Sequence, residues 1–198
     1  MGHNSPSYLH HLIEAKKLAF ADLERYVADP NRMDFPPAYL LSDTFIQRRW
    51  EELDPGHAAE SPSPGPLAAE TETTYLTAAD AKGNMVSFIN SLGSAFGSGV
   101  VVPGTGFALQ NRGVGFTLES GYPNTVDPGK RPFHTIIPAF VTRETGDGRQ
   151  VPWLSFGVIG GSMQPQGHVQ VFLNMVLFGM DIQQAIEPLV SDTWMTVA

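Results

Sequence analysis

One candidate nucleophile in this sequence is Thr73, which follows Glu72 at the edge of a strand-like segment. The sequence before this point is rich in Ala, Ser and Pro, and the sequence after it alternates in the manner of β-structure. A threonine hydroxyl inside a chain is a weak nucleophile. At a chain terminus its own α-amino group, with a pKa of about 7.7–8.0, can serve as the base. The boundary is therefore either a plain linker before a strand, which the residues alone favour because Thr is a good strand former, or a cleavage site between Glu72 and Thr73.

A pair of glycines, Gly160 and Gly161, could supply a second part of a catalytic site. They join a buried-type strand to a helix that begins near Pro165. Free backbone N–H groups at such a junction can hold an anion or a developing oxyanion. Every helix start also needs its N–H donors satisfied, so capping is the favoured interpretation and catalysis the alternative.

Several other chemistries find no support in the residues. There is no cysteine, so a thiolate nucleophile, a disulfide and a cysteine metal site are excluded. The six histidines form no zinc-binding spacing, and no serine lies in the G-x-S-x-G motif of α/β-hydrolases. The short Gly-x-Gly runs do not match a phosphate loop. We therefore expect neither a metal nor a cofactor.

Composition and charge limit the partners. The chain has 198 residues, 42% hydrophobic and 16% charged, with a net charge of -8 and a pI near 5.1. Without a basic stripe, neither nucleic acid nor an anionic membrane is expected to bind. There is no apolar run long enough for a membrane span and no secretory signal, which favours a cytoplasmic location.

The periodicity of the sequence predicts an α+β fold. Apolar residues recur at helical spacing near both ends, and alternation with a period of two predominates between them. Asp29-Pro30 ends the first helix, Gly83 provides the turn of a hairpin, and Gly179 ends a helix. The predicted helices are 7–27, 42–53 with Ser42 as cap, the stretch from about Pro165 to Gly179, and 181–190 with Asp181 as cap; the predicted strands are 73–79, 84–90, 107–111, 135–142 and 152–159.

Four motifs, in their order and spacing, resemble the γ-glutamyltranspeptidase family. They are Thr73-Thr74-Tyr75-Leu76-Thr77-Ala78-Ala79-Asp80, Phe96-Gly97-Ser98-Gly99-Val100, Lys130-Arg131-Pro132-Phe133-His134-Thr135 and Gly160-Gly161-Ser162. The resemblance covers about Ser7 to Val190. It implies an N-terminal nucleophile hydrolase fold, an αββα sandwich that is incomplete in this chain. Residues 1–72 would correspond to the C-terminal part of the large subunit, and 73–198 to a small subunit shortened at its C-terminus.

The resemblance also implies catalytic roles. Thr73 would cleave the bond after Glu72, become the N-terminal nucleophile and attack a γ-glutamyl amide, while Gly160 and Gly161 would hold the oxyanion. Ser91 falls where the family places a hydroxyl that bonds the nucleophile. Thr77, on the same strand face as Thr73, is expected near Ser91 as a substrate-binding residue.

The substrate residues depart from the family pattern. His134 and Thr135 stand where the family has a pair of serines for the α-carboxylate. Arg112 and Gly115 stand where it has the glutamine and aspartate that hold the α-amino group, and Gly93 where it has an asparagine. A cation in place of an acid should weaken the binding of a free amine and could instead receive a carboxylate.

Three functions follow as expectations. The first is an autoprocessing γ-glutamyltransferase or hydrolase that acts on glutathione-like amides, and the second is a glutaryl or cephalosporin-type acylase. The third is a truncated, non-catalytic remnant. The expected partner is a small acyl amide. Missing large-subunit sequence or another chain could be required, and a homo-oligomer is compatible with the sequence.

Overall fold

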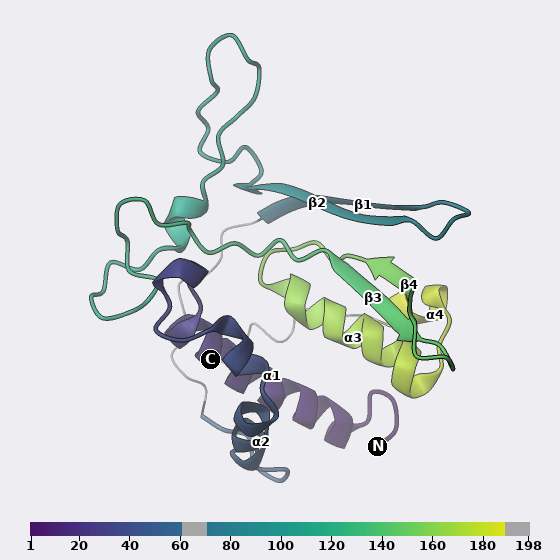
Figure 1. The fold of residues 1–198 in the computed structure, drawn as a ribbon. Helices are drawn as coiled ribbons and strands as arrows, with labels where there is room; N and C mark the ends of the chain where they lie inside the picture. Colours follow the sequence, from purple (N-terminus) through teal and green to yellow (C-terminus); the bar gives the residue numbers. More distant parts are fainter. Residues whose placement is uncertain (61–70, 189–198) are drawn as a thin grey trace. The chain divides into compact units, whose positions relative to one another are not determined.

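The computed structural model describes residues 1–60 and 71–188, and for Thr71 and Glu72 it describes only the backbone. These residues form two compact units, each built from two stretches of chain. Unit 1 contains 1–60 and 113–133, and unit 2 contains 71–112 and 134–188. Helices and strands both occur, which confirms the α+β class (Figure 1). None of the described helices is long and apolar enough to cross a bilayer.

Unit 1 is helical, and its helix boundaries follow local signals. The first helix, α1 (Pro6–Tyr26), is capped by Ser5, whose side chain accepts from the Tyr8 amide. The second, α2 (Asp43–Glu51), is capped by Ser42 as predicted. Between them lie the short 3₁₀ turns η1 (Pro30–Arg32) and η2 (Pro37–Leu41), and the unit also includes most of η3 (Arg112–Gly115).

Two ion pairs hold the helices and the later stretch of unit 1 in place. Arg49 on α2 binds Asp22 on α1 at 2.9 Å. Beyond α1, Asp29 accepts hydrogen bonds from both the backbone amide and the guanidinium of Arg131, at 3.0 and 2.9 Å. The Asp29–Arg131 pair joins the segment before the predicted cleavage site to the segment after it.

Unit 2 contains two antiparallel hairpins and two helices. The first hairpin is β1 (Thr71–Ala79) with β2 (Met85–Ser94), and Gly83 has a φ of 83° in its turn. The second is β3 (Ala139–Glu144) with β4 (Gln150–Phe156). The helix α3 (Met163–Phe178) ends at Gly179, which has a φ of 66°, and α4 (Ile182–Ile186) begins with a capping box at Asp181. These glycines adopt the left-handed conformation that side chains disfavour.

The second hairpin lies between the first hairpin and α3. Successive residues at the end of β4 alternate between the two faces, as the pleat requires. Ser155 bonds the Thr77 hydroxyl on β1, and Phe156 lies beside His168 on α3 with ring centroids 4.9 Å apart. Gly157 then meets the Tyr75 ring, and Val158 meets α3. The result is two strand layers covered by a helix.

Three predicted elements are shorter than expected, and one is absent. The strand predicted at 135–142 begins only at Ala139, the strand at 152–159 ends at Phe156, and the last helix ends at Ile186 because Pro188 follows. Part of the predicted 181–190 helix lies outside the described residues.

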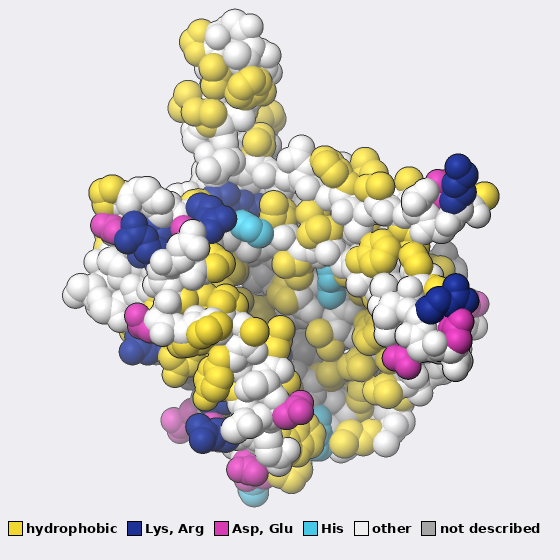
Figure 2. All heavy atoms as spheres, in the orientation of Figure 1, with side chains coloured by type: hydrophobic (Ala, Val, Ile, Leu, Met, Phe, Trp, Pro, Cys, Tyr) yellow, Lys and Arg dark blue, Asp and Glu magenta, His cyan; other side chains and the backbone are white. Residues whose placement is uncertain are grey.

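No strand forms at 107–111. Only an isolated bridge joins Val101 to Ala108, because four glycines with positive φ keep the backbone of this loop irregular; they are Gly97, Gly99, Gly104 and Gly106. The loop is also rich in exposed apolar side chains, including Phe96 and Phe107, and Figure 2 shows hydrophobic groups along it without charged ones.

Candidate active site

A cavity of about 450 Å³ in unit 2 brings three of the four predicted catalytic residues together. Thr73, Ser91 and Gly160 all line it. They come from β1, from β2 and from the turn between β4 and α3. The other lining residues were not predicted from the sequence; they are Thr74, Asn90, Leu92, Ala95 and Ile159.

Thr73 lies at an irregularity of the first hairpin. Glu72 pairs with Gly93 and Thr74 pairs with Asn90, so Thr73 alone lies opposite two residues of β2. Such a β-bulge bends the strand and changes the direction of nearby side chains, and bulges are frequent beside active sites. The Thr73 hydroxyl is buried and bonds no group in the described parts of the chain. An unpaired buried hydroxyl is costly, and this one belongs to a residue that lines the cavity.

The turn that carries the two glycines leaves their amides without acceptors. Gly160 and Gly161 have φ values of 111° and 57°. Their carbonyl oxygens accept from the amides of Met163 and Gln164 at 3.0 and 3.1 Å, which starts α3. Within the described residues neither glycine N–H donates a hydrogen bond, so both remain available to an anion.

Arg112 connects two of the other predicted residues. One guanidinium nitrogen donates to the Ser91 hydroxyl at 2.8 Å, and another donates to the Thr135 hydroxyl at 3.1 Å. Ser91 also accepts from the amide of Gly93 at 3.0 Å. No carboxylate of the described residues pairs with Arg112, and burial lowers the pKa of its guanidinium. Arginine stays charged nonetheless, so this cluster holds an uncompensated positive charge.

The remaining predicted residues are not among those that line the cavity. His134 is exposed and makes no polar contact with the described residues. Thr77 is not among the cavity residues, since its hydroxyl donates to the Val86 carbonyl at 2.9 Å and bonds Ser155. Glu72 is placed only through its backbone pairing.

The structure also explains why glycine occupies position 93. A Cβ built on Gly93 would lie 2.1 Å from Oδ1 of Asn111, and the φ of Gly93 is 97°. The Asn111 amide fills this space and bonds Ser94 through both its oxygen and its nitrogen, at 3.0 and 2.8 Å. No side chain can therefore be accommodated at position 93 without moving Asn111.

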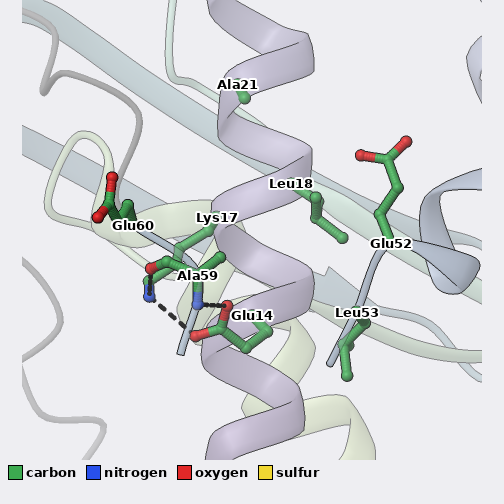
Figure 3. A pocket seen from close by; sticks show the side chains of 8 residues that line it. All are labelled: Glu14, Lys17, Leu18, Ala21, Glu52, Leu53, Ala59 and Glu60. Atoms are coloured by element: carbon green, nitrogen blue, oxygen red, sulfur yellow. Dashed lines mark hydrogen bonds and ion pairs between the residues drawn. The ribbon is translucent and has the colours of Figure 1, made fainter. Parts of the chain in front are cut away.

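A second, smaller cavity lies in unit 1 and is a structural feature. Its volume is about 90 Å³, and it lies between α1, the end of α2 and Ala59 (Figure 3). The buried carboxylate of Glu14 accepts from Lys17 at 2.8 Å and from the Ala59 amide at 3.0 Å, and Lys17 donates to the Ala59 carbonyl at 2.9 Å. These bonds link the chain at Ala59 to α1 and pair both oxygens of the Glu14 carboxylate. No group of three or more metal-ligating side chains occurs in the described residues.

Comparisons with known proteins identify the family of this chain. A family model described as gamma-glutamyltranspeptidase matches residues 1–195. The chain is 39% identical over 184 residues to the glutathione hydrolase-like YwrD proenzyme of Bacillus subtilis and 35% identical over 189 residues to the oxamate amidohydrolase proenzyme of Klebsiella pneumoniae. These matches include 93% and 94% of this chain but 33% and 34% of the relatives, so the chain spans about a third of their length.

Solved structures give the same result for the fold. A cephalosporin acylase from Bacillus halodurans superimposes with a TM-score of 0.79 at 47% identity, covering 93% of this chain and 32% of that one. A gamma-glutamyltranspeptidase from Pseudomonas nitroreducens superimposes with a TM-score of 0.51 at 32% identity, covering 57% of this chain and 61% of that one. The similar proteins are enzymes, and several are described as proenzymes.

Proposed function

This chain belongs to the gamma-glutamyltranspeptidase family, and from that premise we propose that it is an autoprocessing amide hydrolase or transferase whose nucleophile is Thr73. One observation carries the proposal. Thr73, Ser91 and Gly160 line one cavity, and in the described residues neither the Thr73 hydroxyl nor the amides of Gly160 and Gly161 have a hydrogen-bond partner. Nucleophile and oxyanion donors must converge in this way for acyl transfer.

The first reaction would be cleavage of the chain's own peptide bond. The Thr73 oxygen attacks the Glu72 carbonyl carbon, the C–N bond breaks, and the Thr73 nitrogen takes up a proton as a free amine. Water then hydrolyses the resulting ester, which gives a carboxylate at Glu72 and restores the Thr73 hydroxyl. The new α-amino group has a pKa near neutrality and can act as the base for the hydroxyl.

The second reaction repeats this chemistry on a substrate amide. Thr73 attacks the acyl carbon, its proton passes to the leaving amine, and the acyl group is transferred from the enzyme to water or to an acceptor amine. The Gly160 and Gly161 amides would stabilise the negative oxygen of the intermediate. Loss of one such donor typically costs about 10²–10³ in kcat.

The first candidate for the acyl group is γ-glutamyl, as in glutathione. Relatives of this chain are described as glutathione hydrolase proenzymes. The α-carboxylate of a γ-glutamyl group could bind beside Arg112, whose guanidinium donates to the Thr135 hydroxyl at 3.1 Å and leaves the proton of that hydroxyl free for a carboxylate.

The second candidate is a glutaryl or cephalosporin-type acyl group, which has a carboxylate but no amine. It is favoured by the unpaired charge of Arg112, because a cation without a neighbouring carboxylate repels an ammonium group and attracts an acid. The similar structure from Bacillus halodurans is described as a cephalosporin acylase. A non-catalytic chain is the third candidate, since this chain spans about a third of the length of its curated relatives.

Intact-mass measurement tests the nucleophile. We expect the full chain to separate into two fragments between Glu72 and Thr73 at neutral pH, and Thr73→Ala to stay whole. Thr74→Ala is the matched control, because it alters the neighbouring hydroxyl and should leave cleavage intact. A wild-type chain that stays whole for days would support the non-catalytic alternative.

Two anilide substrates test the acyl group. Cleavage of γ-glutamyl and glutaryl anilides should show a preference for glutaryl if the charge of Arg112 decides selectivity. In Arg112→Gln the KM for glutaryl anilide should rise about tenfold or more, which corresponds to about 1.4 kcal/mol of binding. Arg143→Gln, on the exposed end of β3, should leave KM unchanged. A wild-type preference for the γ-glutamyl compound would refute the electrostatic argument.

A further inference from the structure

The turn with Gly160 and Gly161 is held from the side of α3 by a residue with no role so far. His168 lies one and a half turns into the helix, and its Nε2 accepts a hydrogen bond from the backbone amide of Val158 at 3.0 Å. Val158 is two residues before Gly160. This bond holds the chain two residues beyond Phe156, where β4 ends.

Gly167, the residue before His168 on α3, packs against the side chain of Val158. A Cβ on Gly167 would lie 2.7 Å from a methyl group of Val158, so the helix and the chain at Val158 are in close contact. The Phe156 ring packs on the His168 imidazole, tilted by 39°. Gly167 and His168 therefore hold the side chain and the amide of Val158, respectively.

The other end of the turn is also tied to α3. Gly160 and Gly161 accept from the amides of Met163 and Gln164. With Val158 bonded to His168, the intervening segment is anchored to one helix on both sides. A glycine pair with positive φ has wide conformational freedom, so the direction of its two amides depends on these anchors.

The bond requires a neutral imidazole, because only an unprotonated Nε2 can accept from an amide. Burial lowers the pKa of His168, and no charged side chain contributes to the change. The environment thus keeps the lone pair available at neutral pH.

We propose that His168 is a positioning residue for acyl transfer, which orients the Gly160–Gly161 amides by holding the Val158 amide. This inference rests on the proposed function for its effect on rate, and on the geometry alone for the bond. Displacement of catalytic groups by about 1 Å can cost about 10²-fold in rate. The proposal therefore predicts a loss in kcat rather than in substrate binding.

Two substitutions distinguish the hydrogen bond between His168 and Val158 from the packing of the His168 ring on Phe156. His168→Phe keeps a ring beside Phe156 but cannot accept, whereas the side-chain oxygen of His168→Gln reaches about as far as Nε2 and can accept. In the full chain we expect His168→Phe to lower kcat and the rate of Glu72–Thr73 cleavage about ten- to a hundredfold, with KM within about twofold. His168→Gln should recover most of both rates. If Phe prevents folding, His168→Asn, which is one methylene shorter than Gln, serves as the non-bonding variant.

A measurement independent of activity keeps this inference distinct from the proposed function. Hydrogen exchange of the Val158 amide, followed by NMR, should be slow in the wild type and in His168→Gln and fast in the non-bonding variant. If the Val158 amide stays protected in the non-bonding variant, the hydrogen bond to His168 is refuted. If protection is lost while kcat and the cleavage rate are unchanged, the positioning role is refuted. A wild type that shows Val158 protection but neither cleavage nor hydrolysis would refute the proposed function alone.

Discussion

At the scale of single residues, the candidate site depends on side chains and amides that lack partners. The Thr73 hydroxyl, the two glycine amides and the Arg112 charge are all uncompensated within the described residues. Folded proteins satisfy most buried polar groups, so these four groups require an explanation. A substrate that is both an amide and an acid would satisfy all of them.

Gly157 shows how closely β1 approaches the end of β4. A Cβ at this position would lie 2.3 Å from the Tyr75 ring, which is itself held by a 2.8 Å hydrogen bond between its hydroxyl and that of Ser87. Gly157→Ala should therefore destabilise the protein by about 1–3 kcal/mol, as overpacked cores do. Urea unfolding measures the change.

The control for this substitution is Gly146→Ala in the β3–β4 turn. No atom lies within 4 Å of a Cβ built there, and the change should stay within about 0.5 kcal/mol. In a Tyr75→Ala background the Gly157→Ala change should cost less than in the wild type, because the obstructing ring is absent. Equal stability of Gly157→Ala and Gly146→Ala would show that the Tyr75 ring moves aside at little cost.

At the scale of elements, local signals predicted the helices well. Ser42 and Asp181 are side-chain caps, and Gly179 ends α3 in the left-handed conformation. Each of these signals acts within four residues and is visible in the sequence. The first hairpin was equally predictable, because alternation and Gly83 specify it without help from the rest of the chain.

Predictions that depended on distant partners were less successful. Residues 107–111 have strand-like composition, but a strand needs a regular neighbour, and the glycines of the preceding loop prevent one. Within the site, no local pattern places Arg112 between Ser91 and Thr135, or His168 against Val158. These contacts arise from tertiary packing, so sequence reasoning could propose their residues only by resemblance or not at all.

The Asp29–Arg131 link between two segments predicts a specific dependence on pH. The guanidinium of Arg131, its backbone amide and the Asn31 amide all donate to this carboxylate and hold the pKa of Asp29 far below its usual range. The unfolded state then binds more protons in acid, so stability falls as pH decreases below about 4. The melting temperature of the wild type should exceed that of Asp29→Asn at pH 6, and the gap should narrow toward pH 3.

Asp127→Asn provides the comparison for this experiment. Asp127 forms a half-exposed pair with Arg32 at 3.7 Å, and such pairs contribute at most about 1 kcal/mol. Its melting temperature should follow that of the wild type at every pH. A gap for Asp29→Asn that is constant from pH 6 to pH 3 would show that this carboxylate does not titrate with folding.

At the scale of the whole molecule, the match to the family model and the superposition on solved structures establish the family and the fold class. The curated relatives are about three times as long as this chain, so assays should compare this chain with any longer form of the protein. The α+β class was predictable from periodicity alone. The allocation of 113–133 to the helical unit was not, because it depends on contacts between segments a hundred residues apart.

Because residues 113–133 belong to unit 1, the proposed cleavage would change the molecularity of unfolding. The chain enters unit 1 twice, before and after Thr73, so cleavage at Glu72 turns one folding unit into a complex of two polypeptides. Unfolding of the uncut Thr73→Ala chain is unimolecular, whereas unfolding of the cut protein releases a fragment. We therefore expect the melting temperature of the cut protein to rise with protein concentration and that of Thr73→Ala to stay constant. Cleavage would thus make the stability of this protein depend on its concentration.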